Sequence, residues 1–244
     1  MAQQPLAERL RPQSLEDYIG QKHLVGENGV FRKFIASGSV PSFILWGPPG
    51  VGKTTLAKIV ATSLNRPFYT LSAVTSGVKE VREVIEKAKN QHLFSARSAF
   101  LFIDEIHRFN KSQQDSLLGA VEQGIVTLIG ATTENPSFEV ISPLLSRCQV
   151  YVLKPMDDEE LQTLLDRALN SDEELKKRNI EVRETEALFR FSGGDARKLL
   201  NVLELVVEAD SDTPVIITNS DDYVNIDPVP SGDIKAGQKL ITVS

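Results

Sequence analysis

The sequence is poor in cysteine and contains no long hydrophobic run. Cys148 is the single cysteine among 244 residues, which excludes an internal disulfide and indicates a reducing compartment. No uninterrupted apolar stretch approaches the roughly 18 residues that a membrane-spanning helix needs. Residues 1–12 hold no apolar core of the kind that a secretory signal requires. These absences predict a cytoplasmic protein that does not enter a membrane.

An excess of positive charge is also missing. The formal net charge is −6, and residues 208–244, with seven acids and two lysines, account for −5 of it. The preceding 207 residues are therefore close to neutral, so any binding of nucleic acid must come from a local basic surface. Internal repeats and low-complexity tracts are absent as well. Hydrophobic residues make up 41% and charged residues 25%, which is typical of a globular chain with one large domain or two small ones.

The first part of the chain alternates short apolar runs with amphipathic stretches. The runs are almost wholly apolar, as strands buried on both faces of a parallel sheet should be. We expect strands at Phe43–Trp46, Phe68–Leu71, Ala99–Ile103, Val126–Gly130 and Val150–Leu153. Between them, apolar positions in 78–88 recur on one face of a helix. The alternation predicts a three-layer α/β domain, which we assign to residues 1–155.

After a hinge expected near Lys154–Pro155, the pattern becomes helical. We assign residues 156–210 to a small helical lid and 211–244 to an acidic tail of uncertain structure. The expected lid helices follow a cap at Asp157 or Asp158, cover 173–177 and 185–191, and begin after Asp195. In the tail, 215–218 and 240–243 favour short strands, with disorder as an equal alternative.

One glycine-rich segment matches the phosphate-binding pattern G-x-x-x-x-G-K-[ST]. It follows an apolar strand and precedes a helical pattern, which is the context that the motif requires. Its backbone N–H groups and the helix N-terminus attract phosphate. Lys53 is expected to reach the β- and γ-phosphates of ATP, and the Thr54 hydroxyl to bind Mg²⁺. The predicted nucleotide-binding residues here are Gly47, Pro48, Pro49, Gly50, Val51, Gly52, Lys53, Thr54 and Thr55.

A second apolar strand ends in two carboxylates, Asp104 and Glu105. Open α/β sheets bind ligands at the carboxyl ends of their strands. We expect Asp104 to hold Mg²⁺ and Glu105 to polarise the attacking water. A strand ending in Asp-Glu is a weak signal alone, and it becomes strong with the phosphate loop upstream. Because a protein that only binds nucleotide does not need Glu105, the pair indicates hydrolysis.

Over about residues 6–218 the chain resembles an AAA+ ATPase, because several short motifs occur in the order typical of that family. These motifs are Arg9–Gly20, the phosphate loop, 104–107, 130–136, 146–148 and 194–197. The resemblance implies an α/β fold with a parallel sheet in strand order 5-1-4-3-2 and a helical lid. The strings 6–12, 104–111, 130–138 and 192–201 resemble, more narrowly, the replication-associated recombination branch of the family. Clamp loaders and branch-migration motors are near relatives.

The resemblance also implies roles for residues outside the two motifs. Arg11, Pro12 and the stretch Tyr18–Gly20, which includes Ile19, would line the adenine pocket. Thr133 would sense the γ-phosphate or the attacking water, with Asn135 as the neighbouring alternative. Arg147 would act as an arginine finger on the next subunit's ATP, and Arg197 as a lid arginine on the γ-phosphate of its own subunit. The catalytic set is thus Glu105, Lys53, Thr133, Arg147 and Arg197.

Several of the residues singled out in the sequence also have a simpler structural alternative. Arg147 would otherwise form an ordinary loop salt bridge, and Arg197 would pair with Glu204 or Asp195. His107 follows Glu105 closely, but no second histidine or cysteine stands at metal-binding spacing, so a structural hydrogen bond is favoured over a metal ligand. Residues 72–111 carry seven cations against five acids, which suits either a DNA-backbone contact or a solvated, ion-paired helix face.

The function implied is a DNA-stimulated ATPase acting at stalled replication forks, in a bacterial cytoplasm or nucleoid. Implied cofactors are ATP and Mg²⁺. Implied partners are single-stranded or forked DNA, further copies of the chain, single-strand-binding protein and replisome components. One alternative is a clamp-loader or Holliday-junction branch-migration ATPase. Another is a nucleotide-binding fragment without turnover, because residues 219–244 do not resemble the helices with which the family oligomerises.

Overall fold

The computed structural model describes residues 4–92, 97–178, 180–182, 184–208, 215–217, 219–220, 223–224 and 240–241. The chain divides into two compact units. We call Pro12–Lys154 the α/β unit, and Met1–Arg11 together with Pro155–Ser244 the helical unit. Residues 1–11 thus group with the lid helices rather than with the sheet. The six acidic positions after Glu208 lie outside the described residues.

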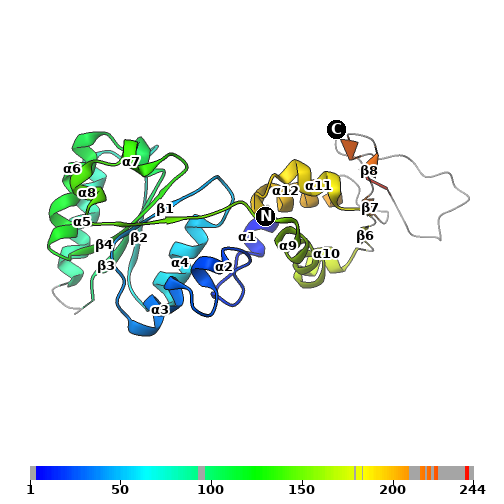
Figure 1. The fold of residues 1–244 in the computed structure, drawn as a ribbon, viewed down its shortest axis with the longest axis horizontal. Coiled ribbons are helices and arrows are strands. Elements are labelled where there is room, and N and C mark those ends of the chain that lie inside the picture. The colour runs from blue at the N-terminus through cyan, green and yellow to red at the C-terminus, as the bar shows by residue number, and fades with distance from the viewer. Residues whose placement is uncertain are drawn as a thin grey trace, which may run out of the picture. The chain divides into compact units, whose positions relative to one another are not determined.

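A five-stranded sheet forms the centre of the α/β unit (Figure 1). Its strands are β1 (Phe43–Trp46), β2 (Phe68–Ser72), β3 (Ala99–Asp104), β4 (Val126–Thr132) and β5 (Gln149–Val152). All neighbouring pairs are parallel, in the order β2-β3-β4-β1-β5. The predicted α/β class and strand order are therefore confirmed. Because the strands are parallel, all their carboxyl ends lie at one edge, where the sequence motifs also lie.

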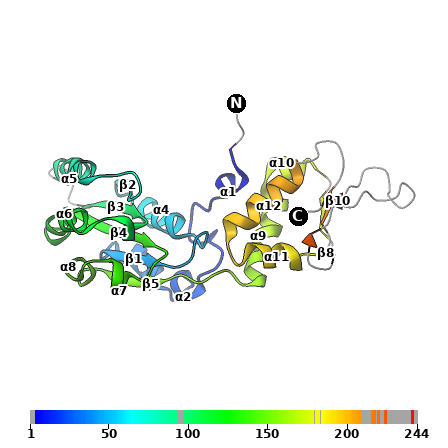
Figure 2. The same ribbon diagram turned by 90° about the horizontal axis from the view of Figure 1, so that it is seen from above.

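Helices cover both faces of this sheet. They are α2 (Lys22–Val25), α3 (Val30–Ser37), α4 (Lys53–Ser63), α5 (Val78–His92), α6 (Lys111–Glu122), α7 (Pro136–Glu139) and α8 (Ser142–Leu145). Figures 1 and 2 show α3 and α4 on one face and α5, α6 and α8 on the other. Phe43 and Leu45 pack on the first face, and Ile44 between them packs on the second. This double burial explains why β1 is apolar without alternation, whereas β5, at the edge of the sheet, leaves Val150 and Val152 exposed.

A buried glutamine fixes the end of the α/β unit. Gln21 has a left-handed backbone (φ 54°) and is only 4% exposed. Its side-chain Nε2 donates to the Lys154 carbonyl at 2.6 Å, and the Lys154 N–H donates to its Oε1 at 2.9 Å. Both hydrogen-bonding groups of the amide are thus used on the backbone of the last residue before the helical unit.

The helical unit contains α1 (Leu6–Arg9), α9 (Asp158–Ser171), α10 (Glu173–Lys176), α11 (Glu186–Ser192) and α12 (Ala196–Glu208). Asp157 caps α9 in a capping box with Glu160, and Asp195 accepts a hydrogen bond from the Lys198 N–H in the first turn of α12. Short strands are also present: β6 (Ile180–Val182), β7 (Val215–Ile217), β8 (Asn219–Ser220), β9 (Tyr223–Val224) and β10 (Leu240–Ile241). β6, β7 and β10 form a parallel sheet, and β6 was not expected from the sequence. No helix in the described parts of the chain is both long and apolar enough to cross a membrane.

Arg9 attaches α1 to the rest of the helical unit. Its guanidinium bonds both carboxylate oxygens of Asp172, at 2.7 and 3.1 Å, and Glu204 at 3.1 Å. Leu6 is fully buried beside it, and its N–H donates to Glu204 at 2.7 Å. Burial alone would raise the pKa of Asp172. Hydrogen bonds from Arg9 and from the N–H groups of Leu175 and Glu174, together with the charge of Arg9, outweigh that effect and lower the pKa.

This cluster predicts an acid-sensitive helical unit. Because the pKa of Asp172 is lower in the folded chain, its contribution to stability is complete above its unfolded pKa, about 3.9, and is lost as the pH falls below it. We expect Arg9→Gln to cost roughly 2 kcal/mol at neutral pH, since the charged hydrogen bonds of Asp172 lose their partner. Unfolding monitored by circular dichroism from pH 7 to 3 tests this. An Arg9→Gln chain with wild-type stability at both pH values would contradict it.

Candidate functional site

The phosphate loop, residues 47–54, connects β1 to α4 at the carboxyl edge of the sheet. Gly47 donates its N–H to the Thr132 carbonyl at 3.1 Å, which ties the start of the loop to the end of β4. A Cβ on Gly47 would lie 2.4 Å from the Leu153 carbonyl oxygen, so only glycine fits there. Gly50 and Gly52 have φ of 70° and 93°, which glycine adopts without strain. The loop is therefore tightly held at its start and sharply turned before α4.

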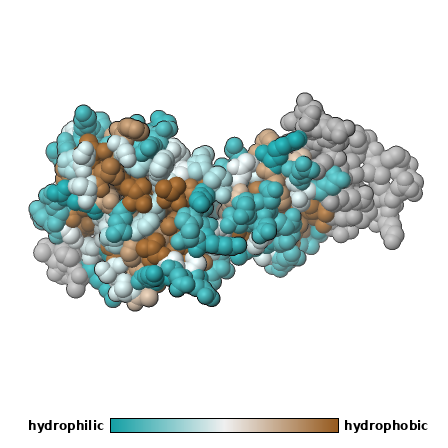
Figure 3. All heavy atoms as spheres, viewed as in Figure 1, coloured by the Kyte–Doolittle hydropathy of each residue, from teal (hydrophilic) through white to brown (hydrophobic). Residues whose placement is uncertain are grey.

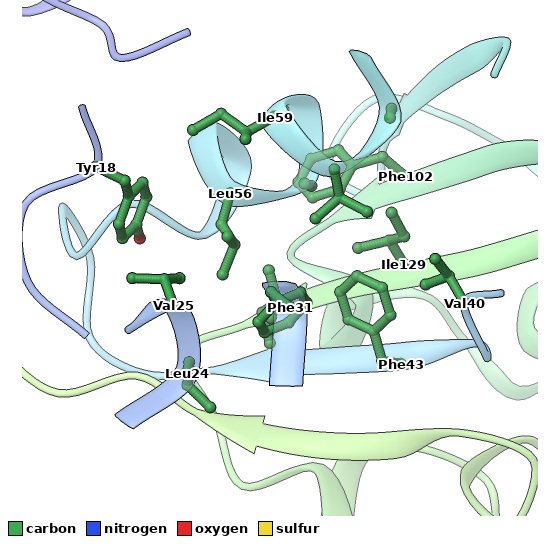
Figure 4. Close-up of a cluster of buried hydrophobic side chains, with 14 of the residues drawn as sticks. Tyr18, Leu24, Val25, Phe31, Val40, Phe43, Leu56, Ile59, Phe102 and Ile129 are labelled. Carbon is green, nitrogen blue, oxygen red and sulfur yellow. The ribbon is translucent and has the colours of Figure 1, made fainter. Parts of the chain in front are cut away.

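Tyr18 supports the loop from behind. It is 7% exposed, and its hydroxyl donates to the Val51 carbonyl at 3.0 Å. A Cβ on Gly52 would lie 2.3 Å from that hydroxyl oxygen. Figure 4 shows Tyr18 at one end of a buried apolar cluster, next to Val25 and to Leu56 of α4. The sequence placed the stretch 18–20 near the adenine pocket but did not reveal this support, because it depends on a contact between positions 33 residues apart.

Lys53 lies at the first position of α4 and is only 7% exposed. Its ammonium group donates to the Gly47 carbonyl at 2.7 Å and the Pro48 carbonyl at 2.8 Å. A buried ammonium group needs such partners, because an unpaired buried charge is costly. The charge is thus held against the loop that is predicted to carry the phosphates. Thr54 and Thr55 follow in the first turn of α4, and both are half-buried.

Asp104 and Glu105 lie where β3 ends. Asp104 is paired with Ser72 of β2, and its carbonyl accepts from the Ala73 N–H at 3.0 Å. Glu105 leaves the strand with φ of 53°, a left-handed backbone that is uncommon for glutamate. Its carboxylate accepts a hydrogen bond from the Thr133 hydroxyl at 3.4 Å. The structure therefore brings together Glu105 and Thr133, which were predicted independently and lie 28 residues apart.

The two candidates for the sensing residue differ in what their side chains do. Thr133 directs its hydroxyl to Glu105. The Asn135 side chain instead accepts from the Ser137 N–H at 3.0 Å and caps α7. We therefore keep Thr133 for the proposed sensing role.

The oxygen ligands suit Mg²⁺ bound with a nucleotide. Thr54, in the helix that follows β1, supplies a hydroxyl, and Asp104, the last residue of β3, supplies a carboxylate. Mg²⁺ takes oxygen ligands and is usually held by one or two protein groups together with the substrate's phosphates. Among the described residues, no group of three or more His, Cys, Asp or Glu side chains forms a metal site. This donor set fits a metal ion that arrives with ATP.

Arg147 forms an ion pair with Glu122 at 2.5 Å and donates to the Pro143 carbonyl at 2.6 Å, so the ordinary loop salt bridge is present in the single chain. Beside it, burial raises the pKa of the Cys148 thiol to about 12, which keeps the thiol protonated and unreactive.

The residues expected to line an adenine pocket are divided between the two units, and Arg197 belongs to the helical unit. Pro12 and the half-buried Ile19 belong to the α/β unit. Arg11 and Arg197 belong to the helical unit, where Arg11 forms an ion pair with Glu8. Arg197 is exposed and has no ion-pair partner among the residues that the structure describes. Glu204, one of its two expected partners, is bonded by Arg9, and Asp195 caps α12.

Comparison with known proteins gives a consistent result. Residues 43–156 match the ATPase family associated with various cellular activities (AAA). The chain is 50% identical over 212 residues to replication-associated recombination protein A of Haemophilus influenzae, covering 86% of this chain and 47% of that protein. It is 49% identical over 210 residues to ATPase WRNIP1 of Dictyostelium discoideum, covering 85% of this chain and 24% of that one. The chain thus spans about half or less of these relatives.

Solved structures add a third relationship. The Thermotoga maritima RuvB Holliday junction branch migration motor superposes with a TM-score of 0.64 at 30% identity, covering 82% of this chain and 65% of that one. A single-residue variant of the same motor gives a TM-score of 0.67.

Proposed function

Because residues 43–156 belong to the AAA family of ATPases, we propose that the chain hydrolyses ATP to ADP and phosphate and couples this reaction to work on DNA at stalled replication forks. One observation carries the proposal. The phosphate loop with its buried lysine and the Glu105–Thr133 pair follow parallel strands of one sheet, at the same edge. The Haemophilus influenzae relative, which is named for replication-associated recombination, supports the DNA part of the proposal.

In this proposal each residue has a distinct task. Lys53 neutralises charge on the β- and γ-phosphates, while Thr54 and Asp104 hold Mg²⁺, which draws charge from the phosphates when bound. Glu105 accepts the proton of the attacking water. Thr133 orients the water or the γ-phosphate, and Arg197 contacts the γ-phosphate from the helical unit. Pro12 and Ile19, with Arg11, line the adenine pocket.

DNA contact is proposed at the start of α5 and α6. The Gln113 side chain of α6 donates to the Ser76 carbonyl just before α5 at 2.9 Å, so the two helix N-termini are adjacent. Lys79 and Lys111 at these ends are exposed, as is Arg108. Helix N-termini and lysines both attract phosphate, and such contacts are independent of base sequence. Lys79 also forms an ion pair with Glu83 at 3.9 Å, but both side chains are exposed, so this pair is weak and leaves Lys79 able to bind phosphate.

ATP turnover with and without single-stranded and forked DNA tests the proposal. We expect DNA to raise the rate of ATP turnover. The double substitution Lys79→Gln with Lys111→Gln should weaken binding to single-stranded DNA. It should also reduce, by roughly 1.4, the slope of the logarithm of the DNA-binding constant against the logarithm of the salt concentration. Lys176→Gln with Lys177→Gln, at the C-terminal end of α10, is the matched control, because it removes the same charge from exposed lysines. ATP binding without turnover, whatever DNA is added, would favour the nucleotide-binding fragment instead.

Association with further copies of the chain is part of the proposal. On the face of the α/β unit shown in Figure 3, hydrophobic patches interrupt the hydrophilic surface. Phe138 of α7 is 85% exposed and Val74, after β2, is 64% exposed. Contiguous apolar patches on a surface are typical of interaction sites. Single-strand-binding protein and replisome components are further proposed partners.

The arginine finger gives a separate prediction. Arg147→Ala should leave ATP affinity unchanged and lower turnover about 10³-fold, because the lost cation would stabilise transition-state charge on a neighbouring subunit's ATP. The loss should occur only where subunits assemble, that is, at protein concentrations at which the turnover per chain of the wild type rises with concentration. Glu122→Gln breaks the same ion pair but keeps the arginine, so it separates the two roles. An unchanged rate in a demonstrated oligomer would refute the finger.

Branch migration is the second candidate function, and the likeness to the branch-migration motor favours it. Greater stimulation by a four-way junction than by a fork of equal length would support this alternative.

A further inference from the structure

We propose that His107 is a positioning residue for Glu105 and links it to the phosphate loop through Thr132. The proposal rests on the hydrolytic role assigned to Glu105. Glu105 begins a sharp left-handed turn directly after β3, so it lies outside the strand whose backbone the sheet holds. Its side chain therefore depends on other contacts for its position. The carboxylate is 31% exposed. Among the described residues, Thr133 and His107 are the side chains in polar contact with it.

His107 is itself held firmly. It lies in the 3₁₀ turn η1 (Ile106–Arg108), which the fully buried Ile106 anchors. The imidazole is 13% exposed. Its Nδ1 lies 3.0 Å from the Thr132 hydroxyl oxygen and 3.2 Å from Glu105 Oε2. One ring nitrogen is therefore within reach of both oxygens.

The hydrogen bonds of Thr132 determine which tautomer fits. Thr132 is fully buried, and its hydroxyl donates to the Glu134 carbonyl at 3.1 Å while accepting from the Glu134 N–H at 3.0 Å. Its single proton is thus used, and an ionised carboxylate only accepts hydrogen bonds. Both oxygens near Nδ1 are then acceptors. The geometry assigns the proton of the neutral imidazole to Nδ1.

Thr132 carries this arrangement to the phosphate loop. It is the last residue of β4, and its carbonyl accepts the N–H of Gly47 at 3.1 Å. A continuous series of contacts therefore joins Gly47, Thr132, His107 and Glu105. It fixes one carboxylate oxygen of Glu105 relative to the loop and leaves the other for the proton of the attacking water. A displacement of about 1 Å in a catalytic group costs roughly 100-fold in rate, so contacts that hold Glu105 in place should have a large effect on turnover.

The test compares three substitutions in the full chain. His107→Leu removes the donor, His107→Gln moves it outward, and His107→Asn keeps a donor at the distance of Nδ1 from the backbone. We expect His107→Leu and His107→Gln to lower kcat about 10- to 100-fold, with KM and nucleotide affinity unchanged. His107→Asn should recover most of that loss. Wild-type kcat in His107→Leu, or equal losses in all three variants, would overturn the proposal.

Two further measurements keep the result interpretable. Thr132→Val combined with His107→Leu should be no worse than the poorer single variant, because both break one series of contacts; additive losses would contradict it. Nitrogen-15 NMR of the imidazoles reads the tautomer without any turnover. The chain has three histidines, so the signal missing in His107→Asn is that of His107. We expect a protonated Nδ1, and a proton on Nε2 alone would overturn the assignment even in a chain that hydrolyses no ATP.

Discussion

A Glu105→Gln chain should bind ATP as tightly as the wild type and hydrolyse it about 10²- to 10⁴-fold more slowly, the range associated with loss of a general base. Glutamine keeps the size of the side chain and can still accept from the Thr133 hydroxyl, which lies 3.4 Å from Glu105 Oε2. It cannot accept a proton from water, so the substitution separates binding from chemistry. Turnover and the affinity for a fluorescent ATP analogue, measured on the same preparation, test this.

The matched control for Glu105→Gln is Glu139→Gln. Glu139 is an exposed acid in α7, a few residues after Thr133 in the chain. It should leave both quantities unchanged, which excludes a general effect of lost negative charge near the site. Sustained wild-type turnover in Glu105→Gln would remove glutamate from the proposed mechanism. A parallel loss of affinity would show that the carboxylate supports the shape of the site instead.

The parts of the fold that could be predicted are those with a local cause. Strand β1 and residues Ala99–Ile103 of β3 are apolar throughout because both faces are covered, and this is visible in the amino-acid sequence alone. Likewise, the spacing of glycines before Lys53 follows from the turn that phosphate requires. The strand order came from resemblance to a family, since apolar runs do not state which strands are neighbours.

The parts that escaped prediction depend on contacts between distant positions. Arg9 was counted among the marks of the α/β domain, yet it bonds Asp172 and Glu204, more than 160 residues later. Tyr18 is a similar case, because its hydroxyl bonds the carbonyl of Val51, 33 residues later. At the site, Glu105 and Thr133 were each predicted, whereas the place of His107 between Thr132 and Glu105 required the turn geometry of η1. Local patterns point to candidate reacting groups, and tertiary contacts reveal what holds those side chains.

Lys53→Ala should reduce ATP affinity by about 100- to 1,000-fold and abolish measurable turnover. The ammonium is expected to bond two phosphates, and charged hydrogen bonds are worth roughly 1.5–3 kcal/mol each. The helix should tolerate alanine at this position, because alanine has the best helix propensity. The carbonyls of Gly47 and Pro48 lose a donor, so the melting temperature must be measured with the affinity.

Lys58→Ala is the control that makes this result specific. Lys58 lies on the same helix, α4, but it is exposed and one turn and a half further along. The two variants remove the same charge and gain the same helix propensity. Only Lys53→Ala should lose ATP, because only the Lys53 ammonium is directed into the loop. Equal affinity in Lys53→Ala and wild type would refute the phosphate-binding role. Equal losses in both variants would assign the effect to long-range charge, which 0.5 M salt would suppress and a direct phosphate contact would largely survive.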